Sequence, residues 1–137
     1  MGLYLCIFEG EDEVEGVDVG SYSDFDFFRS SVTELLEDGV AGRNFPTLII
    51  HPDSDGEWST TECYSLKHEL ETIAMGFQQL PGVEFRAGWQ QQVSNLLGLK
   101  STSLYDSFID VDGELLVDRL IELCNVAIER QLSIQFQ

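Results

Sequence analysis

Apolar and polar residues follow two different periods along the 137-residue chain. Three short runs, at 3–8, 45–50 and 132–136, are almost continuously apolar and rich in β-branched or aromatic residues, which is typical of β-strands. The first two predict strands buried on both faces, and Pro46 stands at the start of its run, where a missing N–H is tolerated. The last predicts a terminal strand that joins a sheet.

Residues 9–20 separate the first run from a helical segment. This stretch is acidic and rich in glycine, and it predicts a loop or an edge hairpin with a short strand through 14–19. A helix with an apolar stripe then begins at Ser23, which is placed to cap it, and Tyr22 is placed as its hydrophobic staple. Gly39 suits the left-handed conformation that ends many helices.

The stretch 45–62 (FPTLIIHPDSDGEWSTTE) contains three predicted elements in close succession. A strand is followed by an acidic loop over 51–57. Ser59 and Glu62 then carry the signature of a capping box, which begins a helix that continues to about residue 79. Such connecting loops are where chains of mixed helix and strand usually present their working surface.

The last third of the chain predicts a brief strand at 83–85, a short helix over 90–97 and a long helix over 113–130. Asp110 and Asp112 form a second acidic turn before the long helix. Asp112 is placed as the N-cap of that helix, because an aspartate side chain accepts hydrogen bonds from the first turn.

Together these elements predict a single α+β domain over residues 1–137, with about three main helices packed on a small mixed or antiparallel sheet. Strands and helices alternate only in part, which disfavours a strictly parallel sheet. Hydrophobic residues make up 43% of the chain, so it can bury a core of its own despite its charge.

The composition is strongly acidic, with 25 Asp and Glu residues against 7 Lys and Arg residues. The formal charge of −18 repels nucleic acid and anionic membranes and attracts a basic protein partner. The alternative is that the acidity serves only solubility. The three cysteines form no CxxC pair and stand among apolar residues, as in a reducing compartment. With no stretch long enough to span a membrane, we expect a cytoplasmic protein.

The acidic loops and the aromatic residues beside them form the candidate partner-binding site. An acidic rim next to a large aromatic side chain is the composition of an electrostatically steered interface with a hot spot. The alternative is that Trp58 is a wholly buried staple and that the acids only form turns. The candidate residues are Asp53, Asp55, Glu57, Trp58, Tyr22, Asp110 and Asp112.

Residues 51–62 also match part of a calcium-binding loop. With Gly56 at the sixth position, three carboxylates stand at the third, fifth and twelfth positions. These are Asp53, Asp55 and Glu62. The first position, however, is His51, a nitrogen donor where a hard cation prefers oxygen. We therefore expect no metal and no cofactor, and a calcium loop is the alternative.

Evidence for catalysis is weak in this sequence. Cys63 with His68, or a serine near His51, would supply a nucleophile and a base, but the chain has no nucleophile-elbow motif and no phosphate-binding glycine loop. Carboxylate pairs are abundant at this charge and identify no chemistry. We expect that the protein is not an enzyme, and a small hydrolase is the weaker alternative.

Three motifs taken together resemble a known family. They are GVDVGSYSDF at 16–25, FPTLIIHPDSDGEW at 45–58 and SFIDVDGELL at 107–116. Over nearly its whole length the chain is similar to the immunity protein 70 family of bacterial polymorphic toxin systems. The resemblance implies a small cytosolic antidote, encoded beside a secreted toxin, that binds the toxin domain and blocks it without catalysis or a cofactor.

The resulting hypothesis is stoichiometric occlusion of a cognate toxin domain that has a basic surface. Nucleic acid and membranes are not expected as partners. A homodimer would form if the terminal strand at 132–136 lay at a sheet edge, where it could pair with a second copy. A metal-binding module at 51–62 and an acidic adaptor without a toxin partner are the alternative functions.

Overall fold

The computed structural model describes residues 2–52, 56–85 and 88–137. Four strands form one antiparallel sheet in the order β2-β1-β4-β3: β1 (Gly2–Glu9), β2 (Asp12–Ser21), β3 (Glu57–Trp58) and β4 (Ile134–Phe136). Three long helices accompany it: α1 (Tyr22–Leu36), α3 (Thr60–Gln78) and α5 (Leu116–Arg130). The predicted α+β class with a small antiparallel sheet is therefore confirmed.

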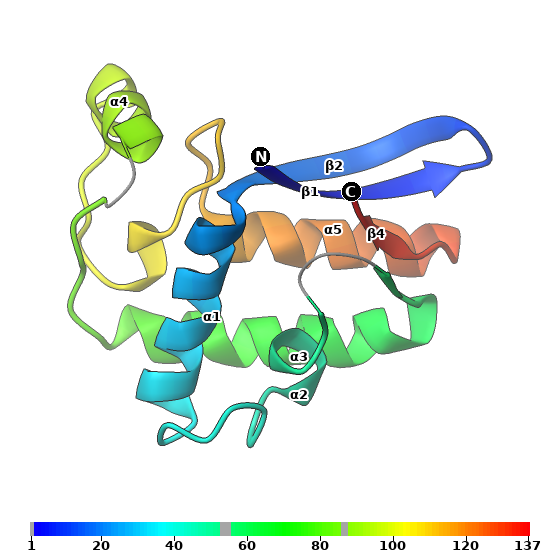
Figure 1. Cartoon of the computed structure of the whole chain (residues 1–137), viewed down its shortest axis with the longest axis horizontal. Coiled ribbons are helices and arrows are strands. Elements are labelled where there is room, and N and C mark those ends of the chain that lie inside the picture. The colour runs from blue at the N-terminus through cyan, green and yellow to red at the C-terminus, as the bar shows by residue number, and fades with distance from the viewer. Residues whose placement is uncertain (1, 53–55, 86–87) are drawn as a thin grey trace.

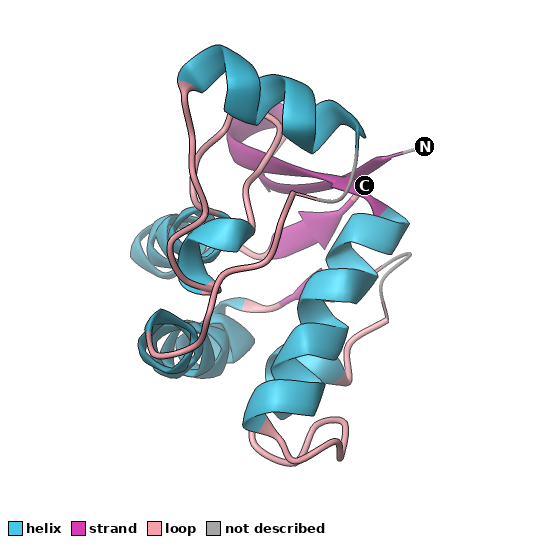
Figure 2. Ribbon diagram, turned by 90° about the vertical axis from the view of Figure 1, so that its left-hand side faces the viewer, coloured by secondary structure: helices cyan, strands magenta, loops and turns pink. Residues whose placement is uncertain are grey.

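The three long helices lie on one side of the sheet (Figures 1 and 2). A shorter helix, α4 (Gly88–Leu97), lies apart from them, near the junction where β2 runs into α1 (Figure 1). Two further helical turns are α2 (Pro46–Ile49) and the 3₁₀ turn η1 (Tyr105–Ser107). The segment 83–85, predicted as a brief strand, is not in regular structure.

One face of the sheet is covered and the other is open, as antiparallel sheets allow. Leu3, Leu5 and Ile7 of β1 belong to the hydrophobic core and are fully buried. The side chains that alternate with them lie on the other face, where Cys6 is fully buried and Tyr4 and Phe8 are half-buried. The prediction that the run 3–8 is buried on both faces therefore holds at Cys6 and is wrong at Tyr4 and Phe8.

Strand β2 leads directly into α1, because Ser21 ends the strand and caps the helix. Ser21 Oγ accepts a hydrogen bond from the Asp24 backbone N–H at 3.1 Å, and the Asp24 carboxylate accepts one from the Ser21 N–H at 2.9 Å. This capping box lies two residues before the predicted cap, Ser23, so that assignment is wrong. At the other end the Gly39 N–H donates to the Thr33 carbonyl at 2.9 Å, which ends the helix as predicted.

The run 45–50 is a helical turn, α2, where a strand was predicted. Pro46 occupies its first turn, and the buried carboxylate of Glu69 accepts hydrogen bonds from the Thr47 and Leu48 N–H groups at 3.1 and 3.0 Å. These bonds satisfy N–H groups that a helix start leaves without a partner. Leu48 is fully buried but Ile50 is 64% exposed, so only one face of the run enters the core.

The capping box at the start of α3 is confirmed. Ser59 Oγ accepts from the Glu62 N–H at 3.1 Å, and the Glu62 carboxylate accepts from the Ser59 N–H at 3.0 Å. Helix α5, in contrast, begins at Leu116 and has Leu115 as its N-cap. Asp112 is therefore not the N-cap that the sequence predicted, and it lies instead in a turn that precedes the helix.

Other parts of the chain contact both edges of the sheet. On β2, the Arg119 guanidinium donates to the Gly16 carbonyl at 3.0 Å, and the Val111 N–H donates to the Asp18 carbonyl at 3.2 Å. On β3, His51 Nε2 lies 2.9 Å from the Glu57 carbonyl oxygen. The terminal strand β4 lies between β1 and β3, so it does not provide the free edge that the predicted homodimer requires.

Candidate partner-binding surface

The structure describes two of the four candidate residues predicted within 53–58. Asp53 and Asp55 lie outside the described residues. Glu57 is exposed on the edge strand β3. Trp58 is only 1% exposed, and its Nε1 donates to the Thr47 carbonyl at 2.9 Å. The interpretation of Trp58 as a buried residue is confirmed, and its prediction as a contact for a partner is wrong.

Asp110 is also a structural residue. It is 1% exposed, and its Oδ1 accepts hydrogen bonds from the Asp112 and Glu114 N–H groups at 2.9 and 3.0 Å. The Arg119 guanidinium lies 3.5 Å from its Oδ2. Burial raises the pKa of Asp110 above its usual range despite these partners. Asp110 therefore shapes the turn and does not reach a partner directly, whereas Asp112 is exposed at its tip.

The acidic turn and the start of α1, where Tyr22 is half-buried, lie together in the fold although they are far apart in sequence. The bond from Val111 to Asp18 holds the turn against the end of β2. Between them is a shallow hollow of about 370 Å³, which we call the Asp18 depression. It is lined by Gly2, Asp18, Gly20, Ser21, Asp24, Trp89 and Val111.

Trp89 completes this depression, and sequence reasoning did not identify it as a site residue. Its Nε1 donates to the Asp24 carboxylate at 3.0 Å. Its ring lies so close to Gly20 that an added Cβ there would be 2.7 Å from the ring carbon Cζ2. The one indication in the sequence is that 87–99 contains no charged residue in an otherwise acidic chain.

Helix α4 rests on a second glycine in the acidic turn. A Cβ added to Gly113 would lie 2.5 Å from Leu97 Cδ1 and 3.1 Å from Val93 Cγ1. Gly20 and Gly113 both have positive φ, at +95° and +83°, so the same two positions supply tight turns and room for α4. The two glycines therefore bring α4 next to exposed carboxylates.

The sheet carries further negative charge, which begins at the Asp18 depression and extends along its strands. The four described strands contain six acidic residues and neither Lys nor Arg: the acids are Glu9, Asp12, Glu13, Glu15, Asp18 and Glu57. Three arginines elsewhere are already engaged in ion pairs with chain carboxylates: Arg43, Arg119 and Arg130. This leaves a strongly negative surface for an outside cation to meet.

The open face of the sheet carries an aromatic residue within this negative field. The Tyr4 hydroxyl donates to Glu13 Oε2 at 2.9 Å, and its ring covers Gly16, where a Cβ would lie 2.0 Å from the hydroxyl oxygen. Burial, with the neighbouring carboxylate, raises the pKa of Tyr4 to about 12. Tyr4 therefore stays neutral and presents a partly exposed aromatic surface among carboxylates.

Two proposed calcium ligands have other partners. His51 Nδ1 lies 2.6 Å from the Pro52 carbonyl oxygen, and its ring stacks on Phe136 with centroids 4.4 Å apart. The Glu62 carboxylate is held in the capping box of α3. Within the described part of the chain, no three His, Cys, Asp or Glu side chains are grouped as metal ligands.

The thiols are arranged as core residues. Cys63 is fully buried, whereas His68 is exposed on the same helix, so the two do not form a nucleophile and base pair. Hydrogen bonding to Cys63, together with burial, raises the pKa of Cys124. Burial also raises the pKa of Cys6 to about 11. Thiols with raised pKa values carry little thiolate and are weak nucleophiles at neutral pH.

Comparison with known proteins gives one match. The family described as Immunity protein 70 matches residues 3–136. No curated protein sequence and no solved structure matches the chain. Of the described helices, none combines the length and apolar character needed to cross a bilayer.

Proposed function

Because the chain belongs to the immunity protein 70 family, we propose that it protects a bacterial cell by binding a cognate toxin domain one to one and occluding it. The match over residues 3–136 is the observation that carries this proposal. The surface described above supports the mode of action, since its acidic strands and turns are suited to recognising another protein by charge and shape.

The partner under this proposal is a toxin domain with a basic surface. The formal charge of −18 attracts such a domain from a distance and speeds the first encounter. If the toxin acts on nucleic acid, the carboxylates of the inhibitor take the place of phosphates. Neither a cofactor nor catalysis is needed for this mode of inhibition, and the proposed place of action is the cytoplasm.

We centre the contact on the Asp18 depression. Asp112 is exposed at its rim and Tyr22 is half-buried in the adjoining first turn of α1. Glu57 belongs to the opposite edge of the sheet, and Asp53 and Asp55 precede it in the sequence. A protein interface of standard size covers about 800 Å² on each partner, which is enough to reach from one edge of a four-stranded sheet to the other.

Co-expression with the toxin domain that is encoded beside this protein tests the proposal. Cell growth is scored first, and a pull-down followed by size-exclusion chromatography then measures the stoichiometry. Rescue of growth with a one-to-one complex is the expected result. Rescue without a complex would contradict occlusion and indicate an activity that repairs the damage. Absence of rescue by folded protein would contradict the immunity function itself.

A further inference from the structure

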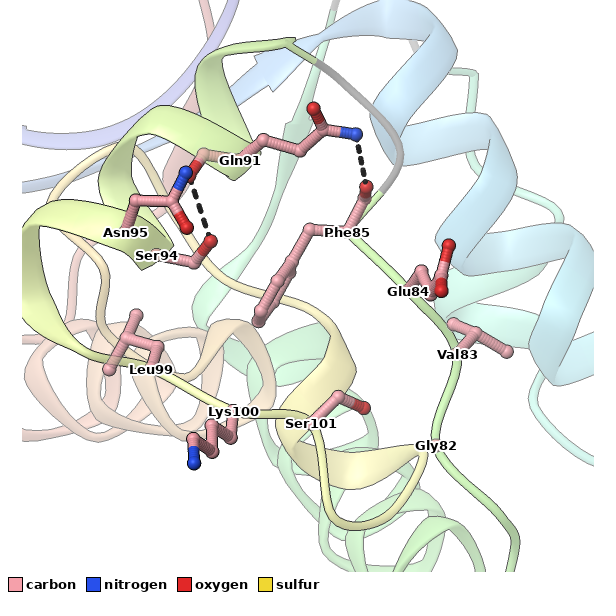
Figure 3. A pocket seen from close by; sticks show the side chains of 10 residues that line it. All are labelled: Gly82, Val83, Glu84, Phe85, Gln91, Ser94, Asn95, Leu99, Lys100 and Ser101. Carbon is pink, nitrogen blue, oxygen red and sulfur yellow. Dashed lines mark hydrogen bonds between the residues drawn. The ribbon is translucent and has the colours of Figure 1, made fainter.

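A second hollow lies on the side of α4 that faces away from Gly20 and Gly113, the two glycines against which the helix packs. It has a volume of about 530 Å³ and opens between the segment 82–85 and α4, with 99–101 at its lower wall (Figure 3). We call it the α4 pocket. It is lined by Gly82, Val83, Glu84, Phe85, Gln91, Ser94, Asn95, Leu99, Lys100 and Ser101.

Polar side chains make up most of the lining of the α4 pocket, and one aromatic and one aliphatic side chain, Phe85 and Leu99, lie among them. The Phe85 ring points from its segment toward Leu99, between α4 and Ser101 (Figure 3). The Gln91 amide donates to the Phe85 carbonyl at 3.1 Å, which ties the segment to the helix. The pocket therefore offers a small apolar contact within a mostly polar lining, and a hydrogen bond joins its two sides.

This region is electrically neutral in a protein of formal charge −18. Helix α4 contains no charged residue, and the pocket lining includes one acid, Glu84, and one base, Lys100. Leu96 and Leu97, on the same helix but outside the pocket lining, are also uncharged and are 83% and 57% exposed. Depletion of charge together with exposed apolar side chains is characteristic of the centre of a protein interface.

We propose that the α4 pocket receives one uncharged aromatic side chain of the toxin domain, which packs against Phe85 and Leu99. This inference rests on the proposed function and adds the anchoring contact to it. Glu84 lies at the pocket itself, and the acidic turn with the exposed Asp112 and Glu114 lies on the other side of α4. Carboxylates thus flank the uncharged helix on both sides, which complements a basic surface with an apolar residue in its middle.

The same charges argue against a second copy of this chain as the occupant. Two copies would each bring a formal charge of −18 to the contact, and the carboxylates around α4 would face one another. Like charges opposed across an interface are strongly unfavourable. A basic toxin gains from the same surroundings.

Four variants of one helix test the inference. Asn95 lines the pocket, whereas Gln92 is an exposed neighbour on α4 outside the lining. Asn95→Asp and Asn95→Lys place either charge inside the pocket, and Gln92→Glu and Gln92→Lys place the same charges beside it. Association and dissociation rates with the purified toxin domain are measured by surface plasmon resonance, after circular dichroism has shown that each variant is folded.

If an aromatic side chain fills the pocket, both charges at position 95 raise the dissociation rate about tenfold, because either charge loses its hydration in the complex. Both variants at position 92 leave the dissociation rate within about twofold of wild type and change only association, in opposite directions. Equal behaviour at the two positions would overturn the inference while leaving toxin binding intact. Failure of the wild-type protein to bind the toxin would instead overturn the proposed function.

Discussion

At the scale of single residues, a buried carboxylate organises the loop between α1 and α2. Glu37 accepts hydrogen bonds from the Gly42, Asn44 and Phe45 N–H groups at 3.2, 2.9 and 2.9 Å. Burial alone would raise the pKa of Glu37, but these N–H groups and the Thr33 hydroxyl favour the charged form and lower it below the usual range. The ionised carboxylate therefore stabilises the folded loop.

We expect Glu37→Gln to lower the free energy of unfolding by about 2 kcal/mol at neutral pH, since charged hydrogen bonds are lost. A pKa that is lower in the folded state contributes stability above the unfolded value of about 4.3. That contribution is lost as the pH falls through the folded pKa. Urea titrations across this range should therefore show wild type and variant converging in acid. Glu34→Gln, at an exposed position, is the control and should match wild type at every pH. A loss of stability in Glu34→Gln that also disappears in acid would contradict the assignment to Glu37.

Arg119 adds a cation to the backbone N–H groups of Glu114 and Asp112 that hold the buried Asp110. Its guanidinium contacts Glu15, Asp110 and Glu122 at 3.4, 3.5 and 2.6 Å and is 18% exposed. We expect Arg119→Met to cost about 3 kcal/mol in the free energy of unfolding, because it leaves a buried carboxylate without its cation. The double variant Arg119→Met, Asp110→Asn should recover much of this loss. Additive losses in thermal or urea unfolding would show that the pair is not coupled.

At the scale of elements, the position of helix α4 is set mainly by its packing against Gly20 and Gly113. We expect Gly20→Ala to displace Trp89, because the new Cβ would lie 2.7 Å from its ring and Gly20 has φ +95°. Gly39→Ala is the matched control, since Gly39 has φ +80° and no atom within 4 Å of an added Cβ. Both variants should lose stability through backbone strain.

The two variants differ in what they do to the tryptophans. In NMR spectra of ¹⁵N-labelled protein, the indole N–H of Trp89 should shift in Gly20→Ala and stay unchanged in Gly39→Ala. The indole of the buried Trp58 serves as an internal reference in both. An unchanged Trp89 signal in Gly20→Ala would contradict the packing of α4 against Gly20.

At the scale of the whole molecule, charge should control the rate of association with the toxin. We expect Asp112→Lys with Glu114→Lys to lower the association rate about tenfold at low salt and to flatten its salt dependence. Asp53→Lys with Asp55→Lys tests the two acids that precede Glu57 in the sequence in the same way, and we expect a comparable effect. Stopped-flow measurements over a range of salt concentrations give these rates.

The control for these variants changes the net charge equally at a different place. Glu34→Lys with Glu71→Lys alters two exposed acids of α1 and α3, so the total charge moves by the same amount. Its effect should be several-fold smaller, because exposed charges farther apart than about 8–10 Å are largely screened. Equal effects from all three double variants would show that total charge acts without a localised contact.

Local patterns were sufficient for much of the fold. The periodicity of 60–79 and the pairing of Ser59 with Glu62 predict α3 and its cap correctly, because both depend on residues within one or two helical turns. The strand prediction for 45–50 failed for the opposite reason. Its first-turn N–H groups are satisfied by Glu69, which lies more than twenty residues further along the chain.

The site shows the same division between near and distant interactions. The acidic character and the family are properties of the residues themselves, and they follow from the chain read alone. Which candidate residues face outward does not follow from the chain alone. Asp110 and Trp58 are buried by segments that no local pattern relates to them. The meeting of Trp89 with Asp24 and Gly20 likewise arises only when β2, α1 and α4 pack together. Charge sums along a chain, whereas exposure depends on what folds back over each side chain.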